Sequence, residues 1–177
     1  MFELTGYAAI VTGGARGIGR AIALALADAG ADVLFTYKGN TTAADAVVAE
    51  INAKGRTAVA VQADAADPDS AVAVVAKAME SFGKVDLLVN NAGITRDMTF
   101  RKMTKADWDI TLRTNLDSVF NMAKQVCDGM VDRGWGRIIN VSSVNGSKGA
   151  FGQTNYAAAK AGMHGFTKAL ALEVAKK

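Results

Sequence analysis

Short apolar runs alternate along this chain with longer segments of helical periodicity, and this alternation strongly constrains the fold. The predicted strands are Tyr7–Val11, Asp32–Tyr37, Thr57–Gln62, Val85–Asn90 and Arg137–Val141. The predicted helices are Ile18–Ala29, Ala43–Lys54, Asp69–Phe82, Ala106–Arg133 and one that begins near Tyr156. Because most strands are continuously apolar, we expect a parallel sheet covered on both faces. The pattern predicts an α/β, Rossmann-like, doubly wound sheet in a three-layer αβα sandwich.

The residues between these segments support the same boundaries. Glycine follows four of the predicted helices, at the positions where left-handed C-caps occur: Gly30, Gly55, Gly83 and Gly134. Asp67 and Pro68 are typical of an N-cap and a first helical residue. Without a linker, repeat or low-complexity segment, residues 1–177 are interpreted as a single domain.

The composition and charge of the chain limit the kinds of molecule that it could bind. The net charge is +3, and the basic residues are spread along the chain rather than gathered in a stripe, which argues against nucleic acid binding. No apolar run reaches the ~20 residues of a membrane span, and no signal peptide is visible. Cys127 is the only cysteine, and no His/Cys cluster suggests a metal site. We therefore expect a cytoplasmic protein without disulfides, membrane or metal.

The stretch TGGARGIGRA, residues 12–21, follows the first predicted strand and opens the first predicted helix. In it, Gly13 can make a tight turn, Gly17 lets a phosphate approach the backbone, and Gly19 lets the helix pack closely. The helix N-terminus would then face a pyrophosphate. The alternative is a flexible turn that is rich in glycine by chance. The order of strand, loop and helix favours a dinucleotide site.

The end of the second predicted strand indicates which dinucleotide. NAD sites usually place an acidic residue there for the ribose 2′-hydroxyl, whereas this chain has Tyr37 and Lys38. Arg16, in the glycine loop, could reach the same place. Two cationic side chains and no carboxylate at this place favour binding of the 2′-phosphate of NADP. The alternative is that Lys38 is an ordinary solvated loop charge.

Tyr156 and Lys160 are four residues apart in the last predicted helix, so they share one face. An ammonium beside a phenol favours the phenolate, which suits acid–base chemistry. Alone, such a pair could be exposed by chance. Two predicted strands, however, end in polar residues, Asn90-Asn91 and Ser142-Ser143, where a doubly wound sheet places its ligand.

Together these motifs resemble those of the short-chain dehydrogenase/reductases. The matching motifs are Thr12-Gly13-x3-Gly17-x-Gly19, Asn90-Asn91-Ala92-Gly93, Ser143, and Tyr156-x3-Lys160. The resemblance implies that Tyr156 donates a proton to a carbonyl whose oxygen Ser143 holds. Lys160 would bind the nicotinamide ribose and assist Tyr156, and Asn115 would support Lys160 through water.

The resemblance also implies cofactor and substrate residues. The cofactor set is Thr12, Gly13, Arg16, Gly17, Ile18, Gly19, Lys38, Asp64, Asn91, Ala92, Gly93, Tyr156 and Lys160, with Asp64 near the adenine. Ser143 and Tyr156 would contact the substrate carbonyl. Asp97 and Gln153 are candidates for polar contacts with the acyl group, and Phe151 for an apolar one.

Within the family, the stretch GWGRIINVSSVNGSKGAFGQTNYAAAKAGMHGFTK resembles the acetoacetyl-CoA reductases of polyhydroxyalkanoate synthesis. The first half of the chain resembles the 3-oxoacyl-[acyl-carrier-protein] reductases of fatty acid synthesis about equally. Family members continue beyond the Tyr–Lys helix, so we expect the chain to be truncated, without the last strands, and the complete protein to be a homotetramer. The alternative outside the enzymes is a fragment that binds NADP without catalysing a reaction. Cys127 and His164 are interpreted as structural or interface residues.

Overall fold

The computed structural model describes residues 3–176 and contains a sheet of five parallel strands. The strands are β1 (Ala8–Val11), β2 (Asp32–Tyr37), β3 (Ala58–Gln62), β4 (Leu87–Asn90) and β5 (Arg137–Asn140). Their order in the sheet is β3-β2-β1-β4-β5, so the direction of winding reverses between β1 and β4. The predicted Rossmann-like fold is confirmed, and each strand lies within two residues of its predicted bounds.

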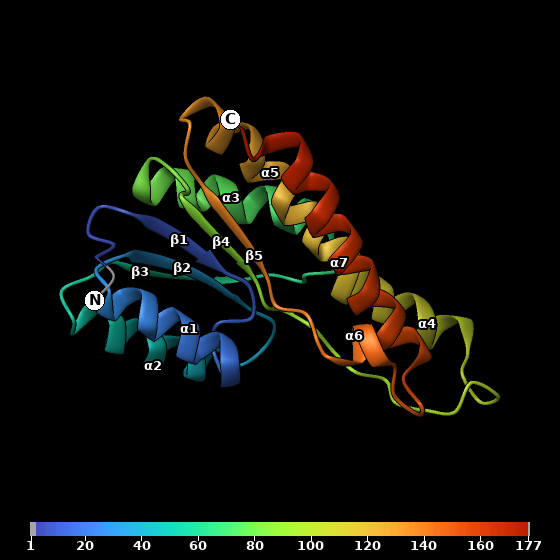
Figure 1. Cartoon of the computed structure of the whole chain (residues 1–177). Helices are drawn as coiled ribbons and strands as arrows, with labels where there is room; N and C mark the ends of the chain where they lie inside the picture. The colour runs from blue at the N-terminus through green and yellow to red at the C-terminus, as the bar shows by residue number, and fades with distance from the viewer. Residues whose placement is uncertain (1–2, 177) are drawn as a thin grey trace.

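Helices cover both faces of the sheet (Figure 1). Helices α1 (Gly17–Asp28) and α2 (Thr41–Asn52) pack on one face, and α3 (Pro68–Phe82) and α5 (Ser118–Asp132) on the other. Helices α4 (Lys105–Leu112) and α6 (Asn145–Lys148) and the first half of α7 (Thr154–Val174) form a group beyond the carboxyl ends of the strands. Within residues 3–176, no helix combines the length and apolar character needed to cross a membrane.

The two faces of the sheet explain why its strands are continuously apolar. Val11, Phe35 and Val89 pack against α1 and α2. Their neighbours Ile10, Leu34 and Leu88 point the opposite way, into a cluster with α3 and α5. Because successive side chains of a strand point to opposite faces, a sheet with helices on both faces needs apolar residues at every position.

The predicted helix ends are confirmed where capping residues mark them. Asp67 caps α3, its side chain accepting a hydrogen bond from the Asp69 N–H, and Pro68 is the first helical residue. Gly83 ends the same helix with φ +73°. Positive φ values of +66° to +102° also occur at Gly30, Gly55 and Gly134.

The helix predicted over Ala106–Arg133 is present, but it is not α-helical throughout. A π-helical turn, η1 (Arg113–Asp117), separates α4 from α5. Asn115, at its centre, is fully buried, and its Nδ2 donates to the Thr111 main-chain oxygen at 2.8 Å and to the Ile94 oxygen at 2.9 Å. A widened turn of this kind re-aims one side chain, and such turns are frequent at functional sites. The short helix α6 was not predicted.

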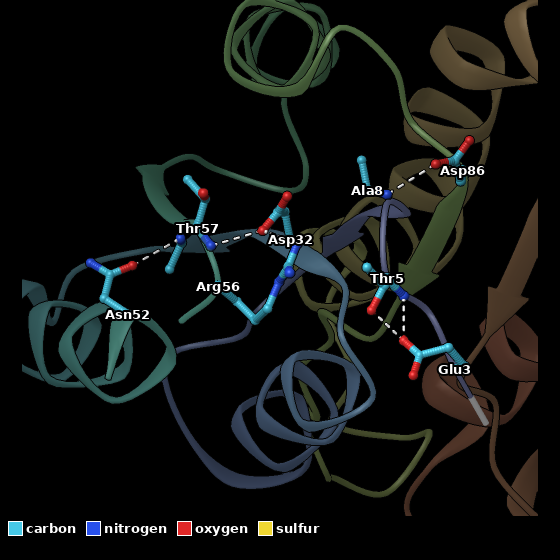
Figure 2. Close-up of polar contacts among 9 residues, drawn as sticks. Glu3, Thr5, Ala8, Asp32, Asn52, Arg56, Thr57 and Asp86 are labelled. Atoms are coloured by element: carbon cyan, nitrogen blue, oxygen red, sulfur yellow. Dashed lines mark hydrogen bonds and ion pairs between the residues drawn. The ribbon is translucent and has the colours of Figure 1, made fainter. Parts of the chain in front are cut away.

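Polar side chains terminate the sheet at the amino ends of its strands, shown in Figure 2. Asp86 accepts a hydrogen bond from the Ala8 N–H at 3.0 Å, and Asp32 accepts from the Arg56 guanidinium at 2.9 Å and from the Thr57 N–H at 2.8 Å. These contacts satisfy backbone groups that the first residues of the strands leave free. They lie at the amino ends of the strands, whereas the candidate site lies at the carboxyl ends.

The interpretation of Cys127 as a packed residue agrees with its surroundings. Its side chain is half-buried on α5, and burial raises the pKa of its thiol. It lines a groove of about 340 Å³ between α5, β5 and α7 together with Trp135, Ile138 and Leu170. A raised thiol pKa means less thiolate at neutral pH, so Cys127 is a weak nucleophile.

Candidate active site

The site forms at the carboxyl ends of β1 and β4, where the direction of winding reverses, the position at which open α/β sheets bind ligands. Thr12, directly after β1, is buried, and its Oγ1 accepts hydrogen bonds from the Asn91 and Ala92 N–H groups, both at 2.9 Å. In return, Asn91 Nδ2 donates to the Thr12 main-chain oxygen at 2.9 Å. These three bonds hold the ends of β1 and β4 together, so the loops that follow start from fixed positions.

The glycine loop is crowded at some positions and open at others. A Cβ on Gly19 would lie 2.1 Å from the main-chain oxygen of Gly13, so only glycine fits there. The close approach that was predicted for Gly19 is therefore between α1 and the loop itself. Gly13 has φ +70°, which makes the predicted tight turn. A Cβ on Gly14 would lie 2.5 Å from the Phe35 Cβ, a constraint that the sequence did not reveal.

The start of α1 is open to a ligand. Gly17 has φ +54°, and outside its chain neighbours and its own helix backbone no described atom lies within 4 Å of the position that its Cβ would take. The N-cap residue, Arg16, makes no side-chain capping hydrogen bond, and the neighbouring Ile18 side chain is 67% exposed. Uncapped N–H groups and the helix dipole favour an anion at this point, so these residues fit the pyrophosphate of a dinucleotide.

Tyr156 and Lys160 lie one turn apart on α7, with the ammonium 5.7 Å from the centre of the phenol ring. Lys160 is only 3% exposed, and burial lowers its pKa to about 8. Its Nζ donates to the main-chain oxygen of Val141 at 2.7 Å. The alternative of a chance pair on an exposed helix face is therefore wrong for Lys160, because a buried ammonium is retained only where the surrounding structure holds it.

Ser143 follows β5 and lies at the same edge of the sheet. Its Oγ accepts a hydrogen bond from the Asn145 N–H at 3.1 Å, and the side chain is half-buried. A hydroxyl has one proton to donate and can accept as well. Within residues 3–176 the Ser143 hydroxyl accepts from the Asn145 N–H and donates to no group, so its proton can bind a carbonyl oxygen.

Asn115 borders the candidate site from the side of η1. Its Oδ1 accepts from the Ile94 N–H at 3.2 Å while its Nδ2 donates to the Ile94 oxygen, so the side chain grips one residue at both main-chain groups. A Cβ on Gly93 would lie 2.5 Å from Asn115 Oδ1 and 3.9 Å from Lys160 Nζ. The structure thus brings Asn115, Gly93 and Lys160 together. The water link between Asn115 and Lys160 stays a prediction.

The family model of the short chain dehydrogenases matches residues 7–177. This chain belongs to the short-chain dehydrogenase family. It is 53% identical to the acetoacetyl-CoA reductase of Cupriavidus necator over 98% of this chain and 71% of that protein. Its identity to the 3-oxoacyl-[acyl-carrier-protein] reductase of Synechocystis is 49%, over 100% of this chain and 72% of the relative.

The structural comparison agrees. A crystal structure from Sinorhizobium meliloti 1021, of a protein assigned to the short-chain alcohol dehydrogenases, superposes with a TM-score of 0.94 at 38% sequence identity. The superposition covers 98% of this chain and 69% of that protein. The chain is thus a short-chain oxidoreductase, and the family uses a nicotinamide cofactor, NAD or NADP.

Lys38 and Asp64, two residues predicted for the cofactor site of this short-chain dehydrogenase, form an ion pair. Lys38 Nζ lies 2.9 Å from Asp64 Oδ2, and both side chains are substantially exposed. The hydrogen bond from Lys38, followed by one from the Ala66 N–H, lowers the pKa of the Asp64 carboxyl. Asp64 also lines a small hollow with Thr12 at the carboxyl ends of the strands. The sequence alone did not indicate that Lys38 and Asp64 form an ion pair.

The residues of this chain that were predicted to contact the acyl group, Asp97, Phe151 and Gln153, lie on adjoining segments. Gln153 Nε2 donates to Asp97 Oδ2 at 2.8 Å, and Gln153 Oε1 accepts from Asn145 Nδ2 at 2.8 Å. Phe151 is 93% exposed and contacts no apolar cluster of residues 3–176. The structure therefore brings Asp97 and Gln153 together and leaves Phe151 projecting from the same loop.

Sequence reasoning missed two asparagines. Asn145 joins Ser143 to Gln153 through its main chain and its side chain. Asn155 is fully buried beside Tyr156, and its Nδ2 donates to Thr111 Oγ1 at 3.1 Å and to the Arg96 oxygen at 3.2 Å. Asn155 could have been suggested by its position next to Tyr156, the proposed acid. No sequence pattern indicated Asn145.

Proposed function

We propose that this chain reduces a 3-oxoacyl thioester with NADPH, and that the substrate is acetoacetyl-CoA, which would give (R)-3-hydroxybutyryl-CoA. The observation that supports the chemistry best is the buried ammonium of Lys160, one turn from Tyr156 and bonded to Val141, two residues before Ser143. The relatives named for acetoacetyl-CoA and for acyl-carrier-protein thioesters support the substrate class.

In this proposal Ser143 donates its hydroxyl proton as a hydrogen bond to the oxygen of the C3 carbonyl. Tyr156 gives its phenolic proton to that oxygen as the carbonyl carbon is reduced. When bound, NADPH would supply the hydride for the carbonyl carbon, which together with the proton from Tyr156 balances a two-electron reduction to the alcohol. The ammonium of Lys160 stabilises the phenolate that Tyr156 becomes.

The chain's own residues can hold the cofactor along the carboxyl ends of the strands. The pyrophosphate would lie at the start of α1, and Lys160 would bind the nicotinamide ribose beside Asn91, Ala92 and Gly93. Lys38 and Arg16 would hold the 2′-phosphate of NADPH. An ammonium has three donors, so Lys38 can keep its bond to Asp64 and still bind a phosphate. This supports NADP over NAD.

For the acyl group, Asp97 and Gln153 would form the polar border and Phe151 the apolar one. The hydrogen bonds that Gln153 makes to Asp97 and Asn145 fix its amide before any substrate arrives. Fixed polar groups lose little entropy on binding, which supports recognition of the thioester at this border.

The decisive experiment mixes the protein with NADPH and acetoacetyl-CoA and follows NADPH absorbance. We expect turnover that Tyr156→Phe lowers by at least about a hundredfold. A parallel assay with an acetoacetyl carrier protein tests the second candidate, the carrier-dependent reductase that the Synechocystis relative exemplifies. Tight NADPH binding without turnover of either thioester would refute the reductase and favour a non-catalytic binding fragment.

A further inference from the structure

Ser142 links the end of β5 to the middle of α7. Its Oγ lies 3.1 Å from the main-chain oxygen of Lys160 and 2.8 Å from Nε2 of His164, and both Ser142 and His164 are half-buried. Ser142 directly precedes Ser143 in the chain. The residue next to the candidate carbonyl-binding hydroxyl is thus bonded to the helical turn that carries the candidate ammonium.

The single hydroxyl proton of Ser142 decides the direction of these bonds. If it goes to Lys160 O, Nε2 of His164 must donate to Ser142 Oγ, and all three groups are satisfied. If it goes to Nε2 instead, Lys160 O loses its partner from β5. The first arrangement makes more hydrogen bonds, so we assign the tautomer with a proton on Nε2 of His164 on that basis.

Lys160 is then held at two places by consecutive residues. Val141 O accepts from its ammonium at 2.7 Å, and Ser142 Oγ donates to its main-chain oxygen. A further attachment lies about two helical turns beyond Lys160 on α7, where Asn140 Nδ2 donates to Thr167 Oγ1 at 2.8 Å. Asn140, the last residue of β5, and Ser142, two residues beyond it, thus both bond to α7.

Directional contacts are needed here because apolar packing fixes register poorly. In its second half, α7 contacts the core through Phe166 and Leu170, which pack with Ile138 against the cluster that contains Leu88 and Val126. Such contacts are non-directional and tolerate sliding. Hydrogen bonds weaken steeply with misalignment, so they select one register.

We propose that Ser142 and His164 are positioning residues, and that their hydrogen-bonded pair sets the register of α7 on β5 and thereby places Lys160 and Tyr156 against Ser143. The proposal rests on the proposed reduction, because that reaction requires these three side chains to meet at one carbonyl. A displacement of about 1 Å at such a site can lower the rate about a hundredfold.

Four variants test the pair. Ser142→Ala removes the central hydroxyl. His164→Phe keeps the ring volume but no donor, whereas His164→Gln places an amide N–H where Nε2 lies. Thr167→Val serves as the matched control, because Thr167 lies farther along α7 from Lys160. It removes the hydroxyl that accepts from Asn140 Nδ2 and donates to the Met163 main-chain oxygen.

The first measurement is the titration of Lys160, followed by NMR of its ε-carbon and assigned with Lys160→Met. In the parent, the buried Lys160 has a pKa of about 8. Ser142→Ala and His164→Phe should raise it toward 10.5, by on the order of one unit, because a loosened turn admits water to the ammonium. His164→Gln should keep the parent value, and Thr167→Val should change it less than Ser142→Ala does.

The second measurement is turnover of acetoacetyl-CoA. Ser142→Ala and His164→Phe should lower kcat roughly tenfold to a hundredfold with little change in KM, and His164→Gln should restore it. If His164→Phe matches the parent and His164→Gln does not, the ring only packs and the proposal fails. It also fails if every variant titrates like the parent.

The two readouts separate this proposal from the proposed function. If the parent shows no turnover, the reductase assignment fails while the titration of Lys160 still decides the positioning role. Thermal unfolding checks that each variant folds. If Ser142→Ala does not fold, the comparison of His164→Gln with His164→Phe carries the test.

Discussion

The ammonium of Lys160 donates to the main-chain oxygen of Val141 at 2.7 Å, and this contact joins α7 to the end of β5 inside the protein. The side chain has little water around it, being 3% exposed. One hydrogen bond does not replace full hydration of an ammonium, so burial lowers the Lys160 pKa to about 8.

We expect the free energy of unfolding to rise as the pH increases from about 8 to 10.5. Below this window, Lys160 is protonated in both states and its buried charge opposes folding. Within it, the unfolded state binds more protons than the folded state, so stability increases with pH. The difference between 10.5 and about 8 corresponds to on the order of 3 kcal/mol from this group.

Chemical denaturation at a series of pH values measures this effect. Lys160→Met, which has no charge to bury, should lack the rise and serves as the reference. Parallel curves for the parent and Lys160→Met would show that Lys160 titrates normally in the folded protein.

Gly19→Ala should disrupt the dinucleotide loop. Its Cβ would lie 2.1 Å from the Gly13 oxygen, a backbone atom that can move only with the loop. We expect a loss of about 1–3 kcal/mol of stability and at least about tenfold weaker NADPH binding, measured by denaturation and by fluorescence titration. Gly55→Ala is the control, because Gly55 has φ +73° and open space around its Cβ position. Equal effects of both variants on NADPH binding would contradict the crowding argument.

Lys38→Ala should discriminate between the two nicotinamide cofactors. Losing a charge-assisted bond to the 2′-phosphate should weaken NADPH binding about tenfold and leave NADH binding nearly unchanged. Lys54→Ala is the matched control, since Lys54 also forms a lysine–aspartate ion pair, with Asp28 at 2.6 Å. Should Lys38→Ala weaken both cofactors equally, the NADP assignment loses its main support.

Asn115→Ala should destabilise the protein by about 1–3 kcal/mol, because it leaves the N–H and C=O of Ile94 without their partner. Amide hydrogen exchange at Ile94 should accelerate. Asn40→Ala is the comparison, since Asn40 caps α2 by accepting from the Ala43 N–H in an exposed setting, and it should leave exchange at Ile94 unchanged. Unaltered exchange at Ile94 in Asn115→Ala would mean that other contacts hold that segment.

The strands and their parallel arrangement could be predicted because each strand is apolar on both faces, and only a sheet with helices on either side buries both. Gly83 and Pro68 marked helix ends for equally local reasons. The π-helical turn could not be predicted. Nothing in the residues around Asn115 departs from a helical pattern, and the turn is accompanied by bonds from Asn115 to Ile94, which is 21 positions away.

The same distinction applies to the site. The motifs indicated Tyr156, Lys160 and Ser143 as partners, yet the ion pair of Lys38 with Asp64 and the bond of Ser142 to His164 came from the structure. Each of these pairs joins segments that approach one another only after the strands have assembled.

By itself, therefore, the sequence determined the layered α/β fold and the types of residue at its ligand edge, because periodicity, turn residues and motif spacing are local properties of the chain. The tertiary structure alone decided how deeply Lys160 is buried, and hence its lowered pKa, and which side chains hold it. Burial and hydrogen-bond partners depend on segments that are distant in sequence, and no local pattern contains that information.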